Sequence, residues 1–594
     1  MPKVPKVPKV PKVPRVPKVP RVPEVLGACL GTMAAMKRFL AASLLLLFPI
    51  TASGQQQPAS RPQPPSTLRA PTRADILRGE YGRYRANNDL LHYDLDIRVN
   101  PEKKWISGKN TIRFKMLKDD TRIQLELFSN YTIEKIAMGS QALKYERDHN
   151  TVYVDFPETL RSGRTYSIEF HYSGQPREEG RFGALAFRTD PAGKQWINTA
   201  NEGEGSASWW PSKDQWRDEP EGADIRVAVP NGLTNVSNGR FMGKTDLGDG
   251  YTRWDYRVHY PINSYNVSLN IAEYAHFSET LGDLTLDYFV LPGNLEKAKV
   301  QFAQAKPMIE AFEKYVGKYP FPKDGFKLIE VPYSGMEHQS AVTYGNRYAN
   351  GYLERDWTGV GVSLKFDFII IHESGHEWFG NAISAADVSD MWIQEGWCNY
   401  LEFIYVEALF GREDAIKYAN GYKSKIGNLE PIITQRGIHR TPNQDMYFKG
   451  ALFLDTLRNA VDDDARWWQL IRDTFEHFKY QNILTGDLVR FFSAELKQDM
   501  TPIFDQYLRR TALPVLELTF DEAAKRVSYR WKADERAFAL PIKVGDPAKW
   551  QVIQPTTDWK SMEWTAGTGA FKVATDLFYV NVAYLDAGGR PLKQ

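Results

Sequence analysis

Cysteine is scarce in this chain, and so is an excess of charge of either sign. Only two of the 594 residues are cysteines, Cys29 and Cys398, so the sequence contains no disulfide framework and the fold must be held by its apolar core. Lys and Arg together number 75 against 73 Asp and Glu, which leaves a net charge of +2. After about residue 54, the chain has no basic patch interleaved with aromatic residues, so we expect no nucleic-acid partner.

Long hydrophobic runs are also lacking. The apolar run from Phe39 to Ile50 has about a dozen residues, too few to span a bilayer permanently. It follows the positive residues Met36-Lys37-Arg38 and precedes the small residues Ala52-Ser53-Gly54, which together are typical of a secretory signal peptide. We therefore expect a signal peptide over 36–54, no stable membrane span, and export to the periplasm or the extracellular space.

Two low-complexity stretches flank this signal. Residues 1–35 consist mainly of a Pro-Lys-Val repeat that can form neither helix nor sheet. We expect this repeat to lie upstream of the true start codon, Met36 or Met33; the alternative is a polybasic tether. Residues 55–80 are rich in Pro, Gln and Ser, which predicts a disordered linker and ordered structure from about Tyr81.

The remaining chain changes its hydrophobic pattern twice. Residues 81–277 alternate with short period between turn residues, which predicts an N-terminal β domain. Residues 278–510 are mostly helical in pattern and contain the motifs described below. Residues 511–594 alternate again, which predicts a C-terminal domain like a β-sandwich. The fold class expected is therefore α+β, with several domains.

The central motif is His372-Glu373-Ser374-Gly375-His376, an H-E-x-x-H element, with Glu395 following after 18 intervening residues. Histidines at i and i+4 lie on one face of a helix, so both imidazoles can bind one ion. Two His and one Glu form a known catalytic zinc set, which leaves a position for water. With ten histidines, an H-E-x-x-H by chance has odds on the order of 1 in 100, and the apolar residues before it lower them.

Five further segments carry recognisable motifs: Trp209 to Pro220, Ser334 to His338, His376 to Asn381, Trp392 to Glu402 and Tyr447 to Ala451. In this order they resemble the motifs W-F-P-x-x-D-E-P, G-x-M-E-N, H-x-W-F-G-N, W-L-N-E-G-F-A-x-Y-L-E and Y-x-K-G-A. These are the motifs of the aminopeptidase N-like zinc exopeptidases of peptidase family M1, which the chain resembles. The resemblance implies a saddle-like N-terminal β domain, a thermolysin-like α/β catalytic domain and one catalytic zinc ion.

The resemblance also assigns the catalytic roles. His372, His376 and Glu395 would bind the zinc ion, and Glu373 would take the proton from the attacking water. Tyr447, in its Y-x-K-G-A context, would donate a hydrogen bond to the oxyanion of the tetrahedral intermediate.

An exopeptidase of this kind must also recognise the free α-ammonium group of its substrate. Glu337 is the residue that matches the family's amine-binding Glu, and Glu202 aligns with a second residue that shares this task; the alternative for Glu202 is an ordinary loop carboxylate. Met336 would line the pocket for the first side chain, or else belong to the core. The backbone at Gly335 would pair with an extended peptide as an added strand.

Several residues depart from the family pattern. Ser334 and His338 replace a Gly and an Asn, Ser374 and Gly375 replace larger apolar residues, and an insertion separates Trp-Pro from Asp-Glu-Pro. Outside the principal site, Glu402 could orient a zinc-binding His, Asp390 could act similarly or be an exposed carboxylate, and Cys398 is expected to be a buried free thiol.

These residues predict a zinc-dependent aminopeptidase that hydrolyses the N-terminal peptide bond of peptides with a free N-terminus. The alternatives are a thermolysin-like zinc endopeptidase, a family member with an additional epoxide hydrolase activity, and a non-catalytic protein on an inherited fold. The sequence leaves open the preferred N-terminal residue, the physiological substrate, the oligomeric state, and the roles of Ser334 and His338.

Overall fold

The computed structural model describes residues 70–178, 183–586 and 588–592, all within the second of two compact units, Pro62–Gln594. The Pro-Lys-Val repeat, the expected signal peptide and most of the expected linker therefore lie outside the described residues. Within the described ranges, no helix has the length and apolar character needed to cross a membrane.

Ordered structure begins before Tyr81, so the prediction of a disordered linker up to residue 80 is wrong. Helix α1 spans Arg73–Gly79 and α2 spans Arg83–Ala86. The side chain of Thr72 accepts from the backbone of Asp75, and the Asp75 carboxylate accepts from the backbone of Thr72 at 2.8 Å. This reciprocal cap and the burial of Leu77 stabilise a helix that composition alone does not predict.

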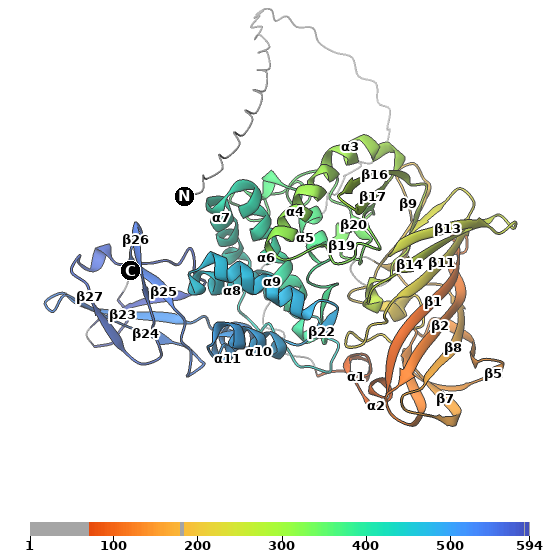
Figure 1. Cartoon of the computed structure of the whole chain (residues 1–594), viewed down its shortest axis with the longest axis horizontal. Helices are drawn as coiled ribbons and strands as arrows, with labels where there is room; N and C mark the ends of the chain where they lie inside the picture. The colour runs from red at the N-terminus through yellow and green to blue at the C-terminus, as the bar shows by residue number, and fades with distance from the viewer. Residues whose placement is uncertain (1–69, 179–182, 587, 593–594) are drawn as a thin grey trace, which may run out of the picture. The chain divides into compact units, whose positions relative to one another are not determined.

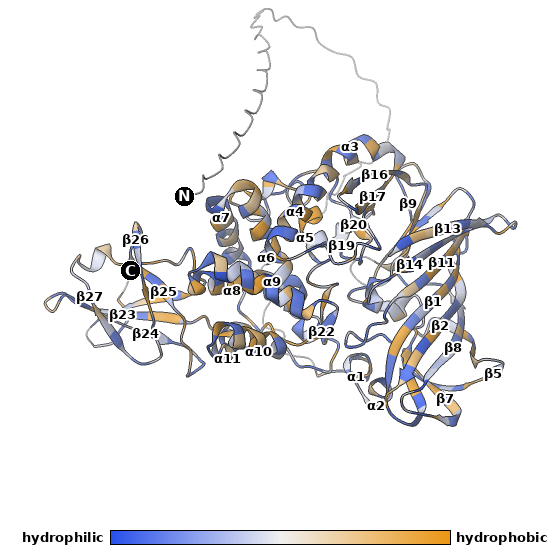
Figure 2. Ribbon diagram, viewed as in Figure 1, coloured by the Kyte–Doolittle hydropathy of each residue, from blue (hydrophilic) through white to orange (hydrophobic). Residues whose placement is uncertain are grey.

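The N-terminal β domain is built on an eight-stranded sheet (Figure 1). Strands β1 and β11 pair in parallel, and the other neighbours pair antiparallel. Buried and less buried residues alternate along β1, and Figure 2 shows hydrophobic and hydrophilic residues interspersed on these strands. In sheet order the strands are β13 Arg240–Asp246, β14 Tyr251–Val258, β11 Ala223–Pro230, β1 Asn88–Asn100, β2 Trp105–Met116, β8 Thr165–Gly174, β4 Tyr131–Met138 and β5 Gln141–Ala142.

Two smaller sheets complete this domain. A three-stranded sheet and a four-stranded sheet both contribute buried residues to the same core as the large sheet. The first has the order β3 Asp120–Glu126, β7 Thr151–Leu160 and β6 Lys144–Asp148. The second has the order β12 Thr234–Val236, β15 Asn270–Ala272, β10 Gln195–Ala200 and β9 Ala184–Thr189.

A five-stranded mixed sheet opens the next region. Its order is β16 Ala275–Leu281, β17 Leu284–Val290, β18 Phe326–Glu330, β20 Val342–Tyr344 and β19 Gly335–Met336. The expected domain boundary at 277 and 278 falls inside β16. Strand β19 is one of the two edge strands of this sheet and pairs antiparallel with β20.

Helices make up most of the region from residue 295 to residue 508. Pro307 lies in the first turn of α4, where its missing N–H leaves no helical hydrogen bond unmade, and a 3₁₀ turn, Phe302–Gln304, separates α3 from α4. The helices are α3 Leu295–Gln301, α4 Ala305–Tyr315, α5 Phe368–Gly375, α6 Trp392–Phe410, α7 Arg412–Tyr422, α8 Asp445–Val461, α9 Asp464–Phe478, α10 Thr485–Leu496 and α11 Thr501–Leu508. A short parallel pair, β21 Ile383–Ala385 and β22 Gln481–Ile483, joins this helical region.

The C-terminal domain has two sheets, which matches the expected sheet-rich fold. Buried residues of both sheets, such as Trp531 and Val544, belong to the core that also contains the central helices. One sheet has the order β27 Lys560–Glu563, β24 Arg526–Lys532, β23 Val515–Asp521 and β29 Asn581–Leu585. The other has the order β26 Lys549–Ile553, β25 Ile542–Asp546 and β28 Lys572–Val573.

Candidate active site

Helix α5 carries His372 to Gly375 and is entirely buried, and His376 is its C-cap residue. Asp367 caps its N-terminus, since its Oδ1 accepts from the backbone N–H groups of Ile369 at 3.1 Å and Ile370 at 3.3 Å. The Nε2 atoms of His372 and His376 lie 3.4 Å and 3.3 Å from Oε2 of Glu395, which is on α6. The two helices therefore bring all three expected metal ligands together.

The opposite ring nitrogens of both histidines are engaged. The Nδ1 atom of His372 lies 2.9 Å from Oε1 of Glu402, and Nδ1 of His376 lies 3.1 Å from the carbonyl oxygen of Phe379. Since both partners are acceptors, each Nδ1 carries a proton, so each Nε2 is the atom that would bind a metal ion. Glu402 thus makes the orienting contact expected of it, and its other oxygen accepts from Tyr418 at 2.6 Å.

The three ligand atoms fit a metal ion. They lie within 4.8 Å of one another, and all three side chains are buried. Zinc bonds of about 2.0–2.2 Å in tetrahedral geometry place neighbouring ligand atoms about 3.3–3.6 Å apart, close to the distances between Glu395 and the two histidines. Among the described residues, Oε2 of Glu395 is buried without a hydrogen-bond partner, a costly state that a bound cation would relieve.

Tyr447 reaches this centre because α6 and α8 cross closely. A Cβ atom on Gly396 would lie 2.9 Å from the carbonyl oxygen of Met446 and 3.1 Å from Cα of Gly450. The two glycines thus allow a backbone approach that larger residues would prevent. As a result, the Tyr447 hydroxyl donates to Oε1 of Glu395 at 2.7 Å.

The edge strand β19 lies directly against α5. A Cβ atom on Gly335 would meet Cγ2 of Ile369 at 2.7 Å and Cγ of Glu373 at 2.9 Å, so the absence of a side chain lets the strand approach the expected catalytic base. Met336 is 6% exposed and packs with Ala200 and Tyr333. Its role as a pocket residue stays a prediction.

Glu337 and Glu202 come from separate segments and lie near enough to the metal ligands for their charges to interact. The Glu337 carboxylate is buried and accepts from the Tyr265 hydroxyl at 2.9 Å. Burial raises the pKa of Glu202 well above its usual range, and the nearby charges of Glu337, Glu395 and Glu373 raise it further. Oε1 of Glu202 is buried without a hydrogen-bond partner in the described part of the chain.

The pKa of Glu373, the expected catalytic base, is also shifted. Burial raises the pKa of Glu373 to about 7 in the metal-free chain, and His372 opposes this shift. Burial likewise raises the pKa of Glu337. Carboxylates gathered in a buried site repel one another, and a cation in their midst lowers this cost.

The weaker candidates have mixed outcomes. Asp390 is not an exposed carboxylate: it is fully buried, and its two oxygens accept from Arg436 at 2.8 Å and 2.9 Å. Cys398 is a buried free thiol, as expected. His338 is also fully buried, and neither of its ring nitrogens has a hydrogen-bond partner among the described residues. Burial lowers the pKa of His338 to about 3.

Comparison with known proteins agrees with this geometry. The model of the peptidase M1 N-terminal domain matches residues 90–265, and the model of the peptidase family M1 domain matches residues 300–507. The chain belongs to peptidase family M1. The two matches follow the order and extent of the sheet domain and of the domain that holds the metal ligands.

Curated relatives of this M1 chain are distant. It is 25% identical over 456 residues to aminopeptidase N of Lactobacillus helveticus, which covers 72% of the chain and 51% of that protein. It is 23% identical over 482 residues to human endoplasmic reticulum aminopeptidase 1, which covers 76% of the chain and 50% of that protein. The M1 chain therefore spans about half the length of the curated relatives it matches.

Solved structures share the fold. The M1 zinc metallopeptidase of Deinococcus radiodurans superposes with a TM-score of 0.61 at 21% identity, over 72% of this chain and 94% of that one. A mutant of the same peptidase, bound to a Tyr-Ser-Ala substrate, has a TM-score of 0.60 at 20% identity, over 72% and 96%.

Two features of this M1 site carry no signal in the sequence. Tyr265, which donates to Glu337, is one of 30 tyrosines and belongs to none of the motifs. Arg78, which contacts the turn that carries Glu202, lies in the stretch that composition assigns to a linker.

Proposed function

We propose that this protein is a zinc-dependent aminopeptidase that removes single residues from the N-terminus of peptides. The observation that carries this proposal is the pair of carboxylates, Glu337 and Glu202, beside a His-His-Glu metal centre. A carboxylate-rich end wall binds a free α-ammonium group, whereas an endopeptidase must accept a neutral peptide bond at the same point. The aminopeptidase names of the M1 relatives support the same conclusion.

Substrate binding follows from the edge strand. An extended peptide would add to β19 through main-chain hydrogen bonds at Gly335, with its ammonium group between Glu337 and Glu202. Because the two carboxylates hold the charged end, the first peptide bond is the one presented to the metal centre. This argument explains removal of one residue at a time.

Catalysis then uses groups that already surround the centre. His372, His376 and Glu395 would hold zinc, which when bound supplies Lewis acidity to the attacking water and the scissile carbonyl. Glu373 takes the proton from that water and returns it to the leaving amine. The Tyr447 hydroxyl, now on Glu395, turns to donate to the oxyanion.

The decisive test compares matched substrates. Aminoacyl fluorogenic substrates and short peptides should be hydrolysed, while the same peptides with an acetylated N-terminus should lose at least about tenfold in kcat/KM, the equivalent of about 1.4 kcal/mol. Equal cleavage of free and acetylated peptides would instead indicate a thermolysin-like endopeptidase. Product analysis by mass spectrometry separates the two, because an aminopeptidase releases free amino acids in order.

Export to the periplasm or the extracellular space is part of the same proposal, and it rests on residues 36–54. The positive, apolar and small-residue segments there are typical of a signal peptide. N-terminal sequencing of the exported protein should begin near Gln55; a mature chain that retains the Pro-Lys-Val repeat would overturn this point.

A further inference from the structure

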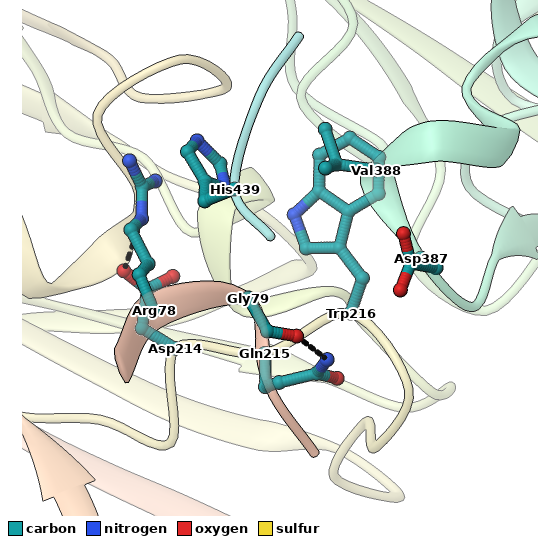
Figure 3. A pocket seen from close by; sticks show the side chains of 8 residues that line it. All are labelled: Arg78, Gly79, Asp214, Gln215, Trp216, Asp387, Val388 and His439. Carbon is teal, nitrogen blue, oxygen red and sulfur yellow. Dashed lines mark hydrogen bonds and ion pairs between the residues drawn. The ribbon is translucent and has the colours of Figure 1, made fainter. Parts of the chain in front are cut away.

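A small cavity lies where helix α1 meets the catalytic region (Figure 3). Residues from four separate parts of the chain line it: Arg78, Gly79, Asp214, Gln215, Trp216, Asp387, Val388 and His439. On one side, the Trp216 ring packs at 5.3 Å against Tyr265, the residue that donates to Glu337. On the other side is the turn that carries Glu202.

Two side chains converge on a single atom of that turn. Nη1 of Arg78 donates to the carbonyl oxygen of Gly203 at 2.8 Å, and Nε2 of His439 donates to the same oxygen at 3.1 Å. Gly203 directly follows Glu202. The turn itself is closed by the backbone N–H of Gly205, which donates to the carbonyl of Asn201 at 2.6 Å. The position of Glu202 therefore depends on a peptide group held from α1 and from the loop around residue 439.

Arg78 also restrains the far end of this turn. Its Nε atom lies 3.5 Å from Oδ2 of Asp214, the ion pair drawn in Figure 3. A Cβ atom on Gly205 would lie 2.1 Å from the Asp214 carboxylate and 2.4 Å from Nη2 of Arg78, and Gly205 has a φ of +83°. The turn thus contacts the Arg78–Asp214 pair directly, and there is no room for a side chain at Gly205.

Helix α1 is held firmly enough to act as a support. The buried Arg85 donates from Nη1 to the carbonyl oxygens of Arg78 at 2.9 Å and Glu80 at 2.7 Å. Its Nη2 pairs with Oε1 of Glu126 at 2.8 Å, and the other Glu126 oxygen accepts from the backbone of Asp214 at 2.8 Å. Arg85 and Glu126 therefore connect α1 to the ion-pair partner of Arg78.

The loop around residue 439 is fixed to the same helix. The backbone N–H of His439 donates to the carbonyl of Asp75 at 3.0 Å. A Cβ atom on Gly79 would lie 2.4 Å from the backbone nitrogen of His439, so α1 and this loop touch backbone to backbone. The position of α1 therefore determines where both donors to Gly203, the side chains of Arg78 and His439, lie.

We infer that Arg78 is a positioning residue for substrate recognition: through the carbonyl of Gly203 it holds the Glu202 carboxylate where the substrate ammonium binds. This inference rests on the proposed aminopeptidase function. It assigns a role in the site to a segment outside the matched M1 domains, which begin at residue 90.

The experiment compares Arg78→Met with Arg73→Met in the full protein. Arg73 lies on the same helix and pairs with Asp148, away from the turn, so the control removes an equal charge from α1. Losing a hydrogen bond from a charged donor should raise KM for an aminoacyl substrate about tenfold in Arg78→Met, with a smaller change in kcat. Arg73→Met should leave both constants unchanged, and Arg78→Lys should recover part of the loss.

Two readouts separate positioning from loss of folded protein. In a double-mutant cycle, Arg78→Met should add little to the effect of Glu202→Gln, because both act on the same contact. Hydrogen–deuterium exchange should rise over residues 199–206 in Arg78→Met and stay unchanged in Arg73→Met. The exchange measurement needs no substrate.

Each outcome is informative. Additive effects of Arg78→Met and Glu202→Gln, or a fall in kcat at constant KM, would overturn the positioning role. Unchanged exchange over 199–206 would also overturn it. If the unsubstituted protein cleaves acetylated and free peptides equally, the proposed aminopeptidase function fails instead, and the exchange result still reports on the turn.

Discussion

The close crossing of α6 and α8 leads to a prediction for Gly396→Ala. The added Cβ would lie 3.1 Å from Cα of Gly450, about 0.4–0.9 Å short of the about 3.5–4.0 Å that carbon atoms prefer. All its near neighbours are backbone atoms, so the helices themselves must separate. Overpacking of this kind costs about 1–3 kcal/mol, and the better helix propensity of Ala offsets about 1 kcal/mol.

The net expectation for Gly396→Ala is a loss of roughly 0–2 kcal/mol in stability together with a loss of activity. Separation by about half an ångström would move Tyr447 from its 2.7 Å contact with Glu395, and misplacement by about 1 Å can cost about 100-fold in rate. We therefore expect kcat to fall by about tenfold. Thermal unfolding and kinetics with an aminoacyl substrate measure the two effects.

Gly486→Ala is the matched control for this prediction. Gly486 lies in α10, and its Cβ would meet only the side chain of Arg490, at 3.5 Å. This variant should gain stability from helix propensity and keep its kcat. If Gly396→Ala gained as much stability as the control and kept its kcat, the close crossing would not position Tyr447 and our account of it would be refuted.

Three further predictions follow from the same site. Glu373→Gln should lower kcat by about 10²–10⁴-fold without lowering the Tm, because Gln removes a buried charge; full turnover would show that Glu373 is not the base. A chelator should abolish activity and lower the Tm, and added zinc should restore both. At a zinc concentration 100-fold above Kd, the stability lost on chelation corresponds to about 2.7 kcal/mol. The Tm of His372→Ala should not respond to the chelator. The folded-state pKa of His338 is about 3, below the usual 6.5, so between these values the unfolded chain binds a proton that the folded chain does not. The free energy of unfolding therefore falls as the pH drops below 6.5, and the loss reaches about 2 kcal/mol at pH 5. In His338→Asn this part of the stability loss between pH 8 and pH 5 should disappear, and an identical pH dependence of Tm in both proteins would contradict the assignment.

The metal centre was predictable because its geometry is local. Histidines at i and i+4 face the same way on any α-helix, and Glu395 lies one helix further on. The motif order likewise identified Glu337 and Tyr447 as candidates. Those two assignments came from the resemblance to family motifs and not from local geometry, since Tyr447 lies 52 residues after Glu395.

The features that the sequence did not predict depend on distant partners. Asp390 is buried because Arg436, 46 residues later in the chain, neutralises its charge, and no local pattern encodes that pair. Helix α1 has seven residues, too few to be stable alone, and is held by contacts with residues as distant as His439. Composition describes such a segment as unfolded because it cannot include those contacts.

The position of α1 also has a practical consequence for truncation. A chain begun at Tyr81, where composition suggests that the folded part starts, would lack Arg78 and the reciprocal cap of Thr72 and Asp75. It would retain both matched family domains and every metal ligand. If the proposed function and the role inferred for Arg78 hold, such a shortened protein would keep the metal ligands but recognise the substrate amine poorly, so its low activity would say little about the intact chain.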